Sequence, residues 1–367
     1  MRLLLSAGGT GGGIYPALAV ANAIREHQPD ITLHFVGSAT GLEHDLIAAT
    51  DTQFDAYSTV QAGPLHGVSL PRAALSLVRL GMGVLQSLGI ILRQRPRAAF
   101  FTGGWVSVPV AVAGWLLRVP IIIYVPDIEP GLTLKVLGRF ARVVTATTED
   151  TAAYFPRRRV VATGYPLRAD VRTATRAAGI QRFELDTQRL TLLVFGGSRG
   201  ARSINRALLA QVQAILAPGD VQIIHVTGGT DWPDVQTAYA QLAPEVRAHY
   251  HLFEYLHNMG LAMAAADLVV SRAGASVLGE FPYFELPAVL VPYPYAWRYQ
   301  KVNADWLASR GAALLLPDED LPAQLAPTVR MLIDDREQRE ALRLAARALR
   351  VDNGAQHIAH VIVEEMT

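Results

Sequence analysis

Two glycine-rich turns in the sequence have the composition of anion-binding sites. One runs from Gly8 to Gly13 (Gly-Gly-Thr-Gly-Gly-Gly) and follows the apolar run Arg2–Ala7; the other is Gly196-Gly-Ser-Arg-Gly-Ala201 and follows Leu190–Phe195. A glycine turn between a strand and a helix lets backbone N–H groups approach a phosphate, and the helix dipole adds to the attraction. The same glycines could simply let a helix pack closely on a strand. Because the two turns occupy matching positions in the two halves, we favour a phosphate-binding cleft.

Neither turn matches two well-known nucleotide-binding motifs. A dinucleotide site requires an acidic residue about 20 residues further on, at the end of the second strand, to hold the ribose. Here that strand ends in Phe35-Val-Gly-Ser38 and carries no carboxylate. A P-loop requires Gly-Lys followed by Ser or Thr, which neither turn contains.

The elements around these turns alternate between short β-branched runs and longer helical stretches. This alternation predicts parallel sheets with crossover helices, and hence an α/β fold. A chain of 367 residues exceeds what one hydrophobic core usually serves, so we expect two Rossmann-like domains. We place an N-terminal domain at 1–165, a charged linker at 166–188, a C-terminal domain at 189–345 and a final helix at 346–367. The predicted strands are Arg2–Ala7, Thr32–Val36, Asp55–Val60, Ala98–Thr102, Ile121–Val125, Val143–Thr147, Val160–Thr163, Leu190–Phe195, Val221–Val226, Tyr250–Phe253, Leu268–Ser271, Ala288–Val291 and Ala312–Leu316.

The composition argues against several classes of function. The 33 Lys and Arg residues balance 32 Asp and Glu residues to a net charge of +1, so no overall basic field favours nucleic acid as a partner. The absence of cysteine excludes disulfides, thiolate nucleophiles and zinc–thiolate sites. The apolar run after Arg2 is too short for a secretory signal, and we interpret it as a first strand.

Several motifs, taken together and in order, carry a family resemblance. They are Gly8-Gly-Thr-Gly-Gly12, Thr102-Gly-Gly-Trp105, Gly131-Leu-Thr133, Gly164-Tyr-Pro-Leu-Arg168, Gly196–Ala201 and the stretch from Ser271-Arg-Ala-Gly-Ala275 to Glu280. On these motifs the whole chain resembles the family 28 glycosyltransferases. The resemblance implies the GT-B fold, in which two Rossmann-like domains face a central cleft and the last helix crosses back to the N-terminal domain. It also implies an inverting transfer of N-acetylglucosamine from UDP-N-acetylglucosamine to a lipid-linked muramyl pentapeptide in peptidoglycan synthesis.

The resemblance assigns most donor contacts to the second half of the chain. Glu280 would accept the ribose hydroxyls, and the backbone of Leu256 would meet the uracil edge. For Glu280 the alternative is an ordinary carboxylate on a helix surface. The residues implied near the diphosphate and the sugar are Thr10, Gly11, Gly12, Arg168, Ser198, Arg199, Gly200, Ala275, Ser276, Tyr299 and Gln300. Tyr299 replaces a family glutamine, which weakens the implied identity of the sugar.

The catalytic side departs from the family pattern. Gly13 stands where the family has a histidine, and Tyr124-Val-Pro-Asp127 stands where it has His-Glu-Gln-Asn. Inverting transfer needs a base that takes the proton of the acceptor hydroxyl. Asp127 and Glu129 follow a central strand at its carboxyl end, where α/β sheets bind ligands, so we predict Asp127 as the base and Glu129 as the second candidate. Alternatively, Asp127 caps the turn before Gly131. The expected acceptor-side residues are Gly13, Gly103, Gly104 and Trp105.

An apolar segment rimmed by arginines predicts contact with an anionic membrane. Leu80–Leu92 holds no charge but is shorter than the about 20 residues that span a bilayer, so we expect a helix that lies on the membrane without crossing it. In the resembling family this region, with Trp115, is the docking patch for a polyprenyl-diphosphate-linked acceptor at the cytoplasmic face. The alternative is a core-facing helix with extended arginines. The apolar residues at helical spacing are Leu70, Leu75, Val78, Met82 and Leu85, and the arginines around them are Arg72, Arg79, Arg93, Arg95 and Arg97.

No metal or other cofactor is expected. Asp318-Glu-Asp320 resembles the metal-binding Asp-x-Asp of other glycosyltransferases, but it has no further ligand set, and we interpret it as an acidic cluster at a helix N-terminus. Glu254 and His257 lack a third ligand. His225, like His44 and His66, is expected to be a surface or packing residue.

Three other functions stay open on the sequence. A diverged transferase could use a UDP-sugar with a different lipid or glycan acceptor. A UDP-sugar 2-epimerase would share the two-domain fold and need no acceptor. A binding protein without activity would hold the donor and not turn it over. The fold alone cannot separate these functions.

Overall fold

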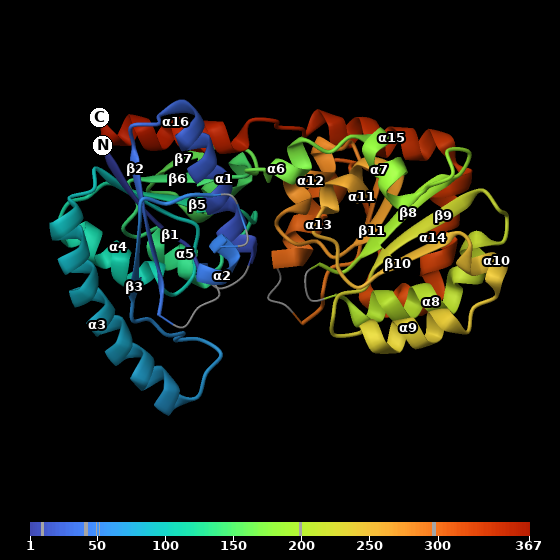
Figure 1. Cartoon of the computed structure of the whole chain (residues 1–367), viewed down its shortest axis with the longest axis horizontal. Helices are drawn as coiled ribbons and strands as arrows, with labels where there is room; N and C mark the ends of the chain where they lie inside the picture. Colours follow the sequence, from blue (N-terminus) through green and yellow to red (C-terminus); the bar gives the residue numbers. More distant parts are fainter. Residues whose placement is uncertain (9–10, 40–42, 49, 51, 198–199, 296–298) are drawn as a thin grey trace. The chain divides into compact units, whose positions relative to one another are not determined.

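The computed structural model describes the chain apart from residues 9–10, 40–42, 49, 51, 198–199 and 296–298. The described residues form two compact units, drawn with their elements labelled in Figure 1. The first unit consists of Met1–Arg168 together with Asp352–Thr367, and the second of Ala169–Val351. Each unit is a parallel sheet with helices packed around it.

The first unit is built on a seven-stranded sheet in the order β3-β2-β1-β4-β5-β6-β7. All neighbouring strands pair in parallel, and the central strands are buried throughout, as expected for a sheet covered on both faces. The predicted strand positions agree closely with the observed ones. The strands are β1 (Arg2–Ser6), β2 (Thr32–Ser38), β3 (Ala56–Val60), β4 (Ala98–Phe101), β5 (Ile121–Val125), β6 (Val143–Ala146) and β7 (Arg159–Ala162).

The helices of the first unit come from both ends of the chain. The last helix, α16, packs against α1, so the C-terminal residues complete the first unit. The described helices are α1 (Gly11–His27), α2 (Glu43–Ala48), α3 (Leu70–Gln94), α4 (Ser107–Leu116), α5 (Leu132–Leu137), η1 (Glu149–Tyr154) and α16 (Gly354–Met366).

Helix α3 buries small residues together with Leu80 and Ile91, and it exposes most of its large apolar residues. Its buried face packs on α4 and includes Ser76, Gly83 and Ser87. A side chain on Gly83 would begin 2.1 Å from the Gln61 carbonyl oxygen, so the close approach of this helix requires glycine there. Leu70, Leu75, Leu77, Val78, Met82, Leu85 and Leu92 are exposed. This pattern is the reverse of an ordinary surface helix, which buries its large apolar residues.

The second unit has a six-stranded parallel sheet in the order β10-β9-β8-β11-β12-β13. Its strands are β8 (Leu190–Phe195), β9 (Val221–Val226), β10 (Tyr250–Phe253), β11 (Leu268–Ser271), β12 (Ala288–Leu290) and β13 (Ala313–Leu315). Its helices are α6 (Ala169–Arg172), α7 (Arg176–Phe183), α8 (Arg202–Leu216), α9 (Trp232–Ala240), α10 (Pro244–Arg247), α11 (Met259–Ala265), α12 (Val277–Tyr283), α13 (Tyr299–Ser309), η2 (Asp318–Asp320), α14 (Leu321–Asp334) and α15 (Arg336–Ala348).

The predicted linker at 166–188 is in large part folded structure. Residues from Ala169 onward belong to the second unit, where α6 and α7 pack against α11. Arg176 donates to the carbonyl oxygen of Ala265 at 2.9 Å and pairs with the Asp267 carboxylate at 2.9 Å. Helix α7 buries few side chains, among them Phe183, and charged residues lie between and around them. The sequence of this stretch therefore resembles a polar linker.

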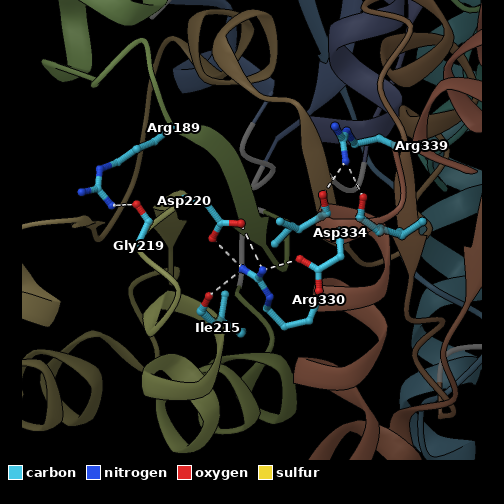
Figure 2. Close-up of polar contacts among 9 residues, drawn as sticks. Arg189, Ile215, Gly219, Asp220, Arg330, Asp334 and Arg339 are labelled. Atoms are coloured by element: carbon cyan, nitrogen blue, oxygen red, sulfur yellow. Dashed lines mark hydrogen bonds and ion pairs between the residues drawn. The ribbon is translucent and has the colours of Figure 1, made fainter. Parts of the chain in front are cut away.

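An arginine-centred cluster closes the amino end of the second sheet (Figure 2). Arg330 on α14 donates to Asp220 at 2.8 Å, to Asp334 at 2.5 Å and to the Ile215 carbonyl oxygen at 3.2 Å. Asp220 directly precedes β9, so the cluster joins α14 to the start of that strand. It lies at the opposite end of the strands from the glycine turn and is structural.

Candidate active site

Each sheet has one point at which the strand order reverses. In the first unit it lies between β1 and β4, and in the second between β8 and β11. Open α/β sheets bind ligands outside the carboxyl ends of the strands at such points. The Gly8 turn follows β1 and the segment Thr102–Gly104 follows β4; the Gly196 turn follows β8 and Arg272–Ser276 follows β11. All four predicted motifs therefore flank a reversal point.

The glycine turn of the second unit requires glycine for steric reasons. Gly197 and Gly200 have φ of 89° and 78°, which side chains rarely adopt, and the N–H of Gly200 donates to the Gly197 carbonyl oxygen at 2.9 Å. Helix α8 begins directly afterwards, and its N-cap residue Ala201 offers no side-chain cap. Such a helix start suits an anion. Ser198 and Arg199, predicted to hold the diphosphate, lie outside the described residues.

The motif after β11 places a buried carboxylate at the start of α12. Glu280 is only 6% exposed, so the alternative of an ordinary surface carboxylate is wrong. Ala275 and Ser276 are half-buried in the turn that leads into the helix. The Asn303 side chain on α13 donates to the Ala273 carbonyl oxygen at 3.1 Å and ties the turn to α13. The sequence alone did not single out Asn303.

Arg272 in the same motif is held by a buried network. Its guanidinium donates to Asp318 at 2.5 Å and to the Ser203 hydroxyl at 2.7 Å, and it lies over the ring of Tyr293 at 5.2 Å. Asp318 stands in η2, directly before α14, as predicted for an acidic cluster at a helix start. Its carboxylate pairs with Arg272. Among the residues that the structure describes, no group of three or more His, Asp or Glu side chains is placed to hold a metal ion.

The other predicted donor residues are distributed over both units. Leu256 is buried after β10. Tyr299 and Gln300 begin α13, and the Gln300 side chain accepts from the N–H of Tyr293 at 2.9 Å. Arg168 ends the N-terminal stretch of the first unit, where its guanidinium lies 5.2 Å from the centre of the Tyr15 ring.

The turns after β1 and β4 are in backbone contact with each other. A side chain on Gly104, whose φ is 81°, would begin 2.6–2.7 Å from the Gly8 backbone. The Thr102 hydroxyl donates to the Gly13 carbonyl oxygen at 2.6 Å. A side chain on Gly13 would begin 3.1 Å from the Gly8 carbonyl oxygen, a tight contact that a shift of a few tenths of an ångström would relieve.

The remaining acceptor-side residues lie in the same turns. Gly103 has φ of 119°, and Trp105 is half-buried just before α4. Gly11 and Gly12 open α1, while Thr10 lies outside the described residues.

The two predicted base candidates have different surroundings. Asp127 is half-buried in the turn after β5. Glu129 is 5% exposed, and its carboxylate accepts from the Lys135 ammonium at 3.0 Å. That ion pair engages the Glu129 carboxylate.

Tyr124, at the family histidine position, is fully buried on β5. Its hydroxyl lies 2.7 Å from the Thr147 hydroxyl, and burial raises the pKa of Tyr124 well above its usual value. A neutral, buried phenol at this position cannot act as the base.

The predicted membrane segment exposes many large apolar side chains. We call the docking face the exposed residues Leu75, Leu77, Val78, Met82 and Leu85 of α3 with Trp115 and Leu116 of α4. Arg79 is exposed beside them, and Trp115 packs on Phe140 with ring centres 5.8 Å apart. Helix α3 is long and apolar enough to cross a membrane by length and composition alone. The alternative of a core-facing helix is wrong for these side chains, because the core side of α3 is formed by other residues.

Comparison with known proteins decides the family. The model of the glycosyltransferase family 28 N-terminal domain matches residues 3–146, and that of its C-terminal domain matches residues 191–359. A relative from Desulforudis audaxviator (strain MP104C) is 35% identical, covering 99% of this chain and 98% of its own length. It is named UDP-N-acetylglucosamine–N-acetylmuramyl-(pentapeptide) pyrophosphoryl-undecaprenol N-acetylglucosamine transferase. The chain belongs to glycosyltransferase family 28.

Solved structures confirm the fold of this family 28 glycosyltransferase. The crystal structure of Acinetobacter baumannii MurG matches with a TM-score of 0.77 at 24% identity, covering 99% of both chains. A putative UDP-N-acetylglucosamine 2-epimerase from Listeria monocytogenes matches with a TM-score of 0.71 at 13% identity, covering 97% of this chain and 94% of its own. The predicted GT-B fold and the family resemblance are thus confirmed, and the epimerase likeness is one of fold.

Proposed function

We propose that this protein transfers N-acetylglucosamine from UDP-N-acetylglucosamine to a polyprenyl-diphosphate-linked muramyl pentapeptide, with inversion at the sugar carbon. The observation that carries the proposal is the 35% identity, over nearly the full length of both chains, to a transferase named for that reaction. The epimerase alternative is supported by a structural likeness at 13% identity. Such a likeness is shared among proteins with different chemistry.

The second unit would bind the donor. The diphosphate would lie at the Gly196–Ala201 turn, where backbone N–H groups and the start of α8 favour negative charge. The buried Glu280 carboxylate would accept both ribose hydroxyls, and the backbone at Leu256 would meet the uracil. A helix start and arginine side chains would stabilise the charge that develops on the departing UDP, which leaves the chemistry without need of a metal.

The first unit would bind the acceptor and supply the base. The turns at Gly13 and Gly103–Trp105 lie at the reversal point of its sheet, where the acceptor sugar would sit. Asp127 would take the proton of the acceptor hydroxyl as its oxygen attacks the sugar carbon and the bond to UDP breaks.

The docking face would bring the enzyme to its lipid-linked acceptor. Its large apolar side chains are exposed on two helices that pack together, and the exposed Arg79 lies on one of them. Exposed apolar groups with arginine nearby suit an anionic bilayer. The protein would therefore act as a peripheral enzyme at the cytoplasmic face of the membrane.

The deciding experiment measures UDP release from UDP-N-acetylglucosamine with and without a short-chain lipid-linked muramyl pentapeptide. Release that depends on the acceptor is the expected result. Formation of an epimerised UDP-sugar without acceptor would replace the proposal with the epimerase function. Donor binding without release would point to another acceptor or to a binding role.

A further inference from the structure

A chain of buried polar side chains lies beside the glycine turn of the second unit. The Tyr250 hydroxyl lies 2.6 Å from Nδ1 of His225, and Nε2 of His225 lies 2.9 Å from Oδ1 of Asn205. The Asn205 amide nitrogen donates at 3.1 Å both to the Thr227 carbonyl oxygen and to Oδ2 of Asp231. All four side chains are at most 5% exposed. This hydrogen-bond network joins β9 and β10 to the first turns of α8.

The hydrogen bonds fix a single direction of donation along this chain. Because the Asn205 nitrogen already donates twice, its oxygen is the acceptor toward His225. His225 therefore carries its hydrogen on Nε2 and accepts from the Tyr250 hydroxyl at Nδ1. Burial lowers the pKa of His225 to about 3, which keeps the ring neutral near pH 7. Every member thus has a partner, as a buried network requires.

At one end, the hydrogen-bond network contacts groups beside Gly200 and the start of α8. The Thr227 carbonyl oxygen, held by Asn205, is the atom that a side chain on Gly200 would meet at 2.0 Å. Asp231 pairs through Oδ1 with Nε of Arg202 at 2.7 Å, and Arg202 is the first residue of α8. The network thereby sets the spacing between the end of β9 and the start of α8.

We propose that Asn205, His225 and Asp231 are positioning residues for the donor diphosphate, acting through the positions of Gly200 in the Gly196–Ala201 turn and of the start of α8. The proposal rests on the proposed function, in which this turn binds the diphosphate of UDP. It predicts a selective effect: substitutions in the network weaken binding of the diphosphate and spare binding of the nucleoside, which other residues hold.

The same strand offers a matched control at its other end. Gln222 on β9 is 2% exposed, and its amide donates to the Asp186 carbonyl oxygen at 2.9 Å and to the Thr191 hydroxyl at 3.0 Å. Its oxygen accepts from the N–H of Asp186 at 2.9 Å. Gln222 is therefore a buried amide whose side chain makes as many hydrogen bonds as that of Asn205, and it lies near the amino end of the strand. Gln222→Ala should lower the melting temperature without changing the affinity for any ligand.

The test compares affinities for UDP and for uridine, by calorimetry and by NMR titration, in the full-length protein. We expect Asn205→Ala to weaken UDP binding about tenfold, as loss of about 1.4 kcal/mol would, and to change uridine binding less than twofold. Equal losses for UDP and uridine, or the same UDP loss in Gln222→Ala, would show a merely structural role. Absence of UDP binding in the unsubstituted protein would instead overturn the donor assignment itself, and this proposal with it.

Asp231→Asn keeps the shape of the side chain and covers the case in which Asn205→Ala does not fold. Removing a negative charge near a diphosphate should strengthen its binding if only the local field mattered. The positioning role predicts the opposite sign, because the new amide would turn its N–H groups toward Arg202 or Asn205, which are donors. Tighter UDP binding in Asp231→Asn would therefore contradict the proposal.

Discussion

The carbonyl oxygen of Thr227 lies 2.0 Å from the point at which a side chain on Gly200 would begin. Gly200 also has φ of 78°, a conformation that side chains rarely adopt. The segment directly after β9 is thus in close contact with Gly200, and only glycine fits there.

Gly200→Ala should therefore destabilise the protein and weaken UDP binding. Because the new methyl group displaces the turn, we expect the free energy of unfolding to fall by about 1–3 kcal/mol, a range typical of strained positions. Urea unfolding and UDP titration measure the two effects. Gly197→Ala is the matched control, since Gly197 shares the positive φ but, among the described residues, has nothing within 4 Å of the added atom. Equal effects in both variants would show that the contact with Thr227 is unimportant.

Glu280→Gln should weaken binding of UDP-N-acetylglucosamine. A hydrogen bond to a charged group contributes about 1.5–3 kcal/mol, so the dissociation constant should rise at least about tenfold. Titration calorimetry with UDP-N-acetylglucosamine gives the value. Glu337→Gln makes the same chemical change on an exposed turn of α15 and should leave affinity unaltered. Native-like affinity in Glu280→Gln would remove this residue from the donor site.

Asp127→Asn should lower turnover while leaving donor affinity unchanged. Loss of a general base costs about 10²–10⁴ in rate. Single-turnover kinetics with saturating donor and acceptor isolate the chemical step. Glu129→Gln should act differently, because it leaves the Lys135 ammonium without its carboxylate partner. We expect it to lower the melting temperature and to change the rate of the chemical step little. Full turnover in Asp127→Asn would exclude Asp127 as the base.

Acidification should weaken the second unit through His225. Its pKa is about 3 in the folded protein and about 6.5 in the unfolded chain. At any pH between these two values the unfolded chain therefore binds more protons than the folded protein does. Stability from this group is complete above about pH 6.5 and is lost as the pH falls. Between pH 7 and 5 the free energy of unfolding should drop by about 2 kcal/mol from His225 alone. Urea unfolding at several pH values measures this decrease in the free energy of unfolding. NMR should find the His225 ring neutral at pH 5, with its hydrogen on Nε2. A ring that titrates near pH 6.5 would contradict the buried network.

Leu85→Glu should reduce binding to vesicles that contain anionic lipid. The side chain is 71% exposed in the docking face, where a carboxylate would oppose both burial in lipid and the negative surface. Vesicle co-sedimentation measures the loss, and turnover of a soluble short-chain acceptor should be unchanged. Leu344→Glu introduces the same charge at a leucine on α15 that is 51% exposed, and it should not affect vesicle binding. Equal vesicle binding by both variants would remove α3 from the membrane contact.

The sequence predicted the sheets well because buried parallel strands are short, apolar and rich in β-branched residues. The segments Ile121–Val125 and Val221–Val226 carry that pattern and appear where expected. The sequence also predicted the motifs that flank the reversal points. Several positions in these motifs have positive φ, which favours glycine, so the motifs appear as clusters of glycine. Helices α6 and α7 were missed, because their buried residues are too few to give a helical period.

The buried polar partners could not be predicted from the sequence. Asn205 and His225 are separated by a helix and a turn, and their contact depends on the pairing of β8 with β9. His225 was therefore expected to be a packing or surface residue, whereas it links two strands to α8. A polar residue at a core-facing position of a helix, as at Asn205, is the one signal that could have found the network.

The chain passes from the first unit into the second at Arg168 and returns at Asp352. The second unit is thus an insertion within the first, and the helix that completes the first unit, α16, is made after the whole of the second unit. During synthesis the second unit can fold as soon as it has emerged, whereas the first must wait, with α1 uncovered, until α16 has also been made. The first unit, in which we propose that the acceptor binds, would accordingly be completed after the second, although most of its sequence comes first.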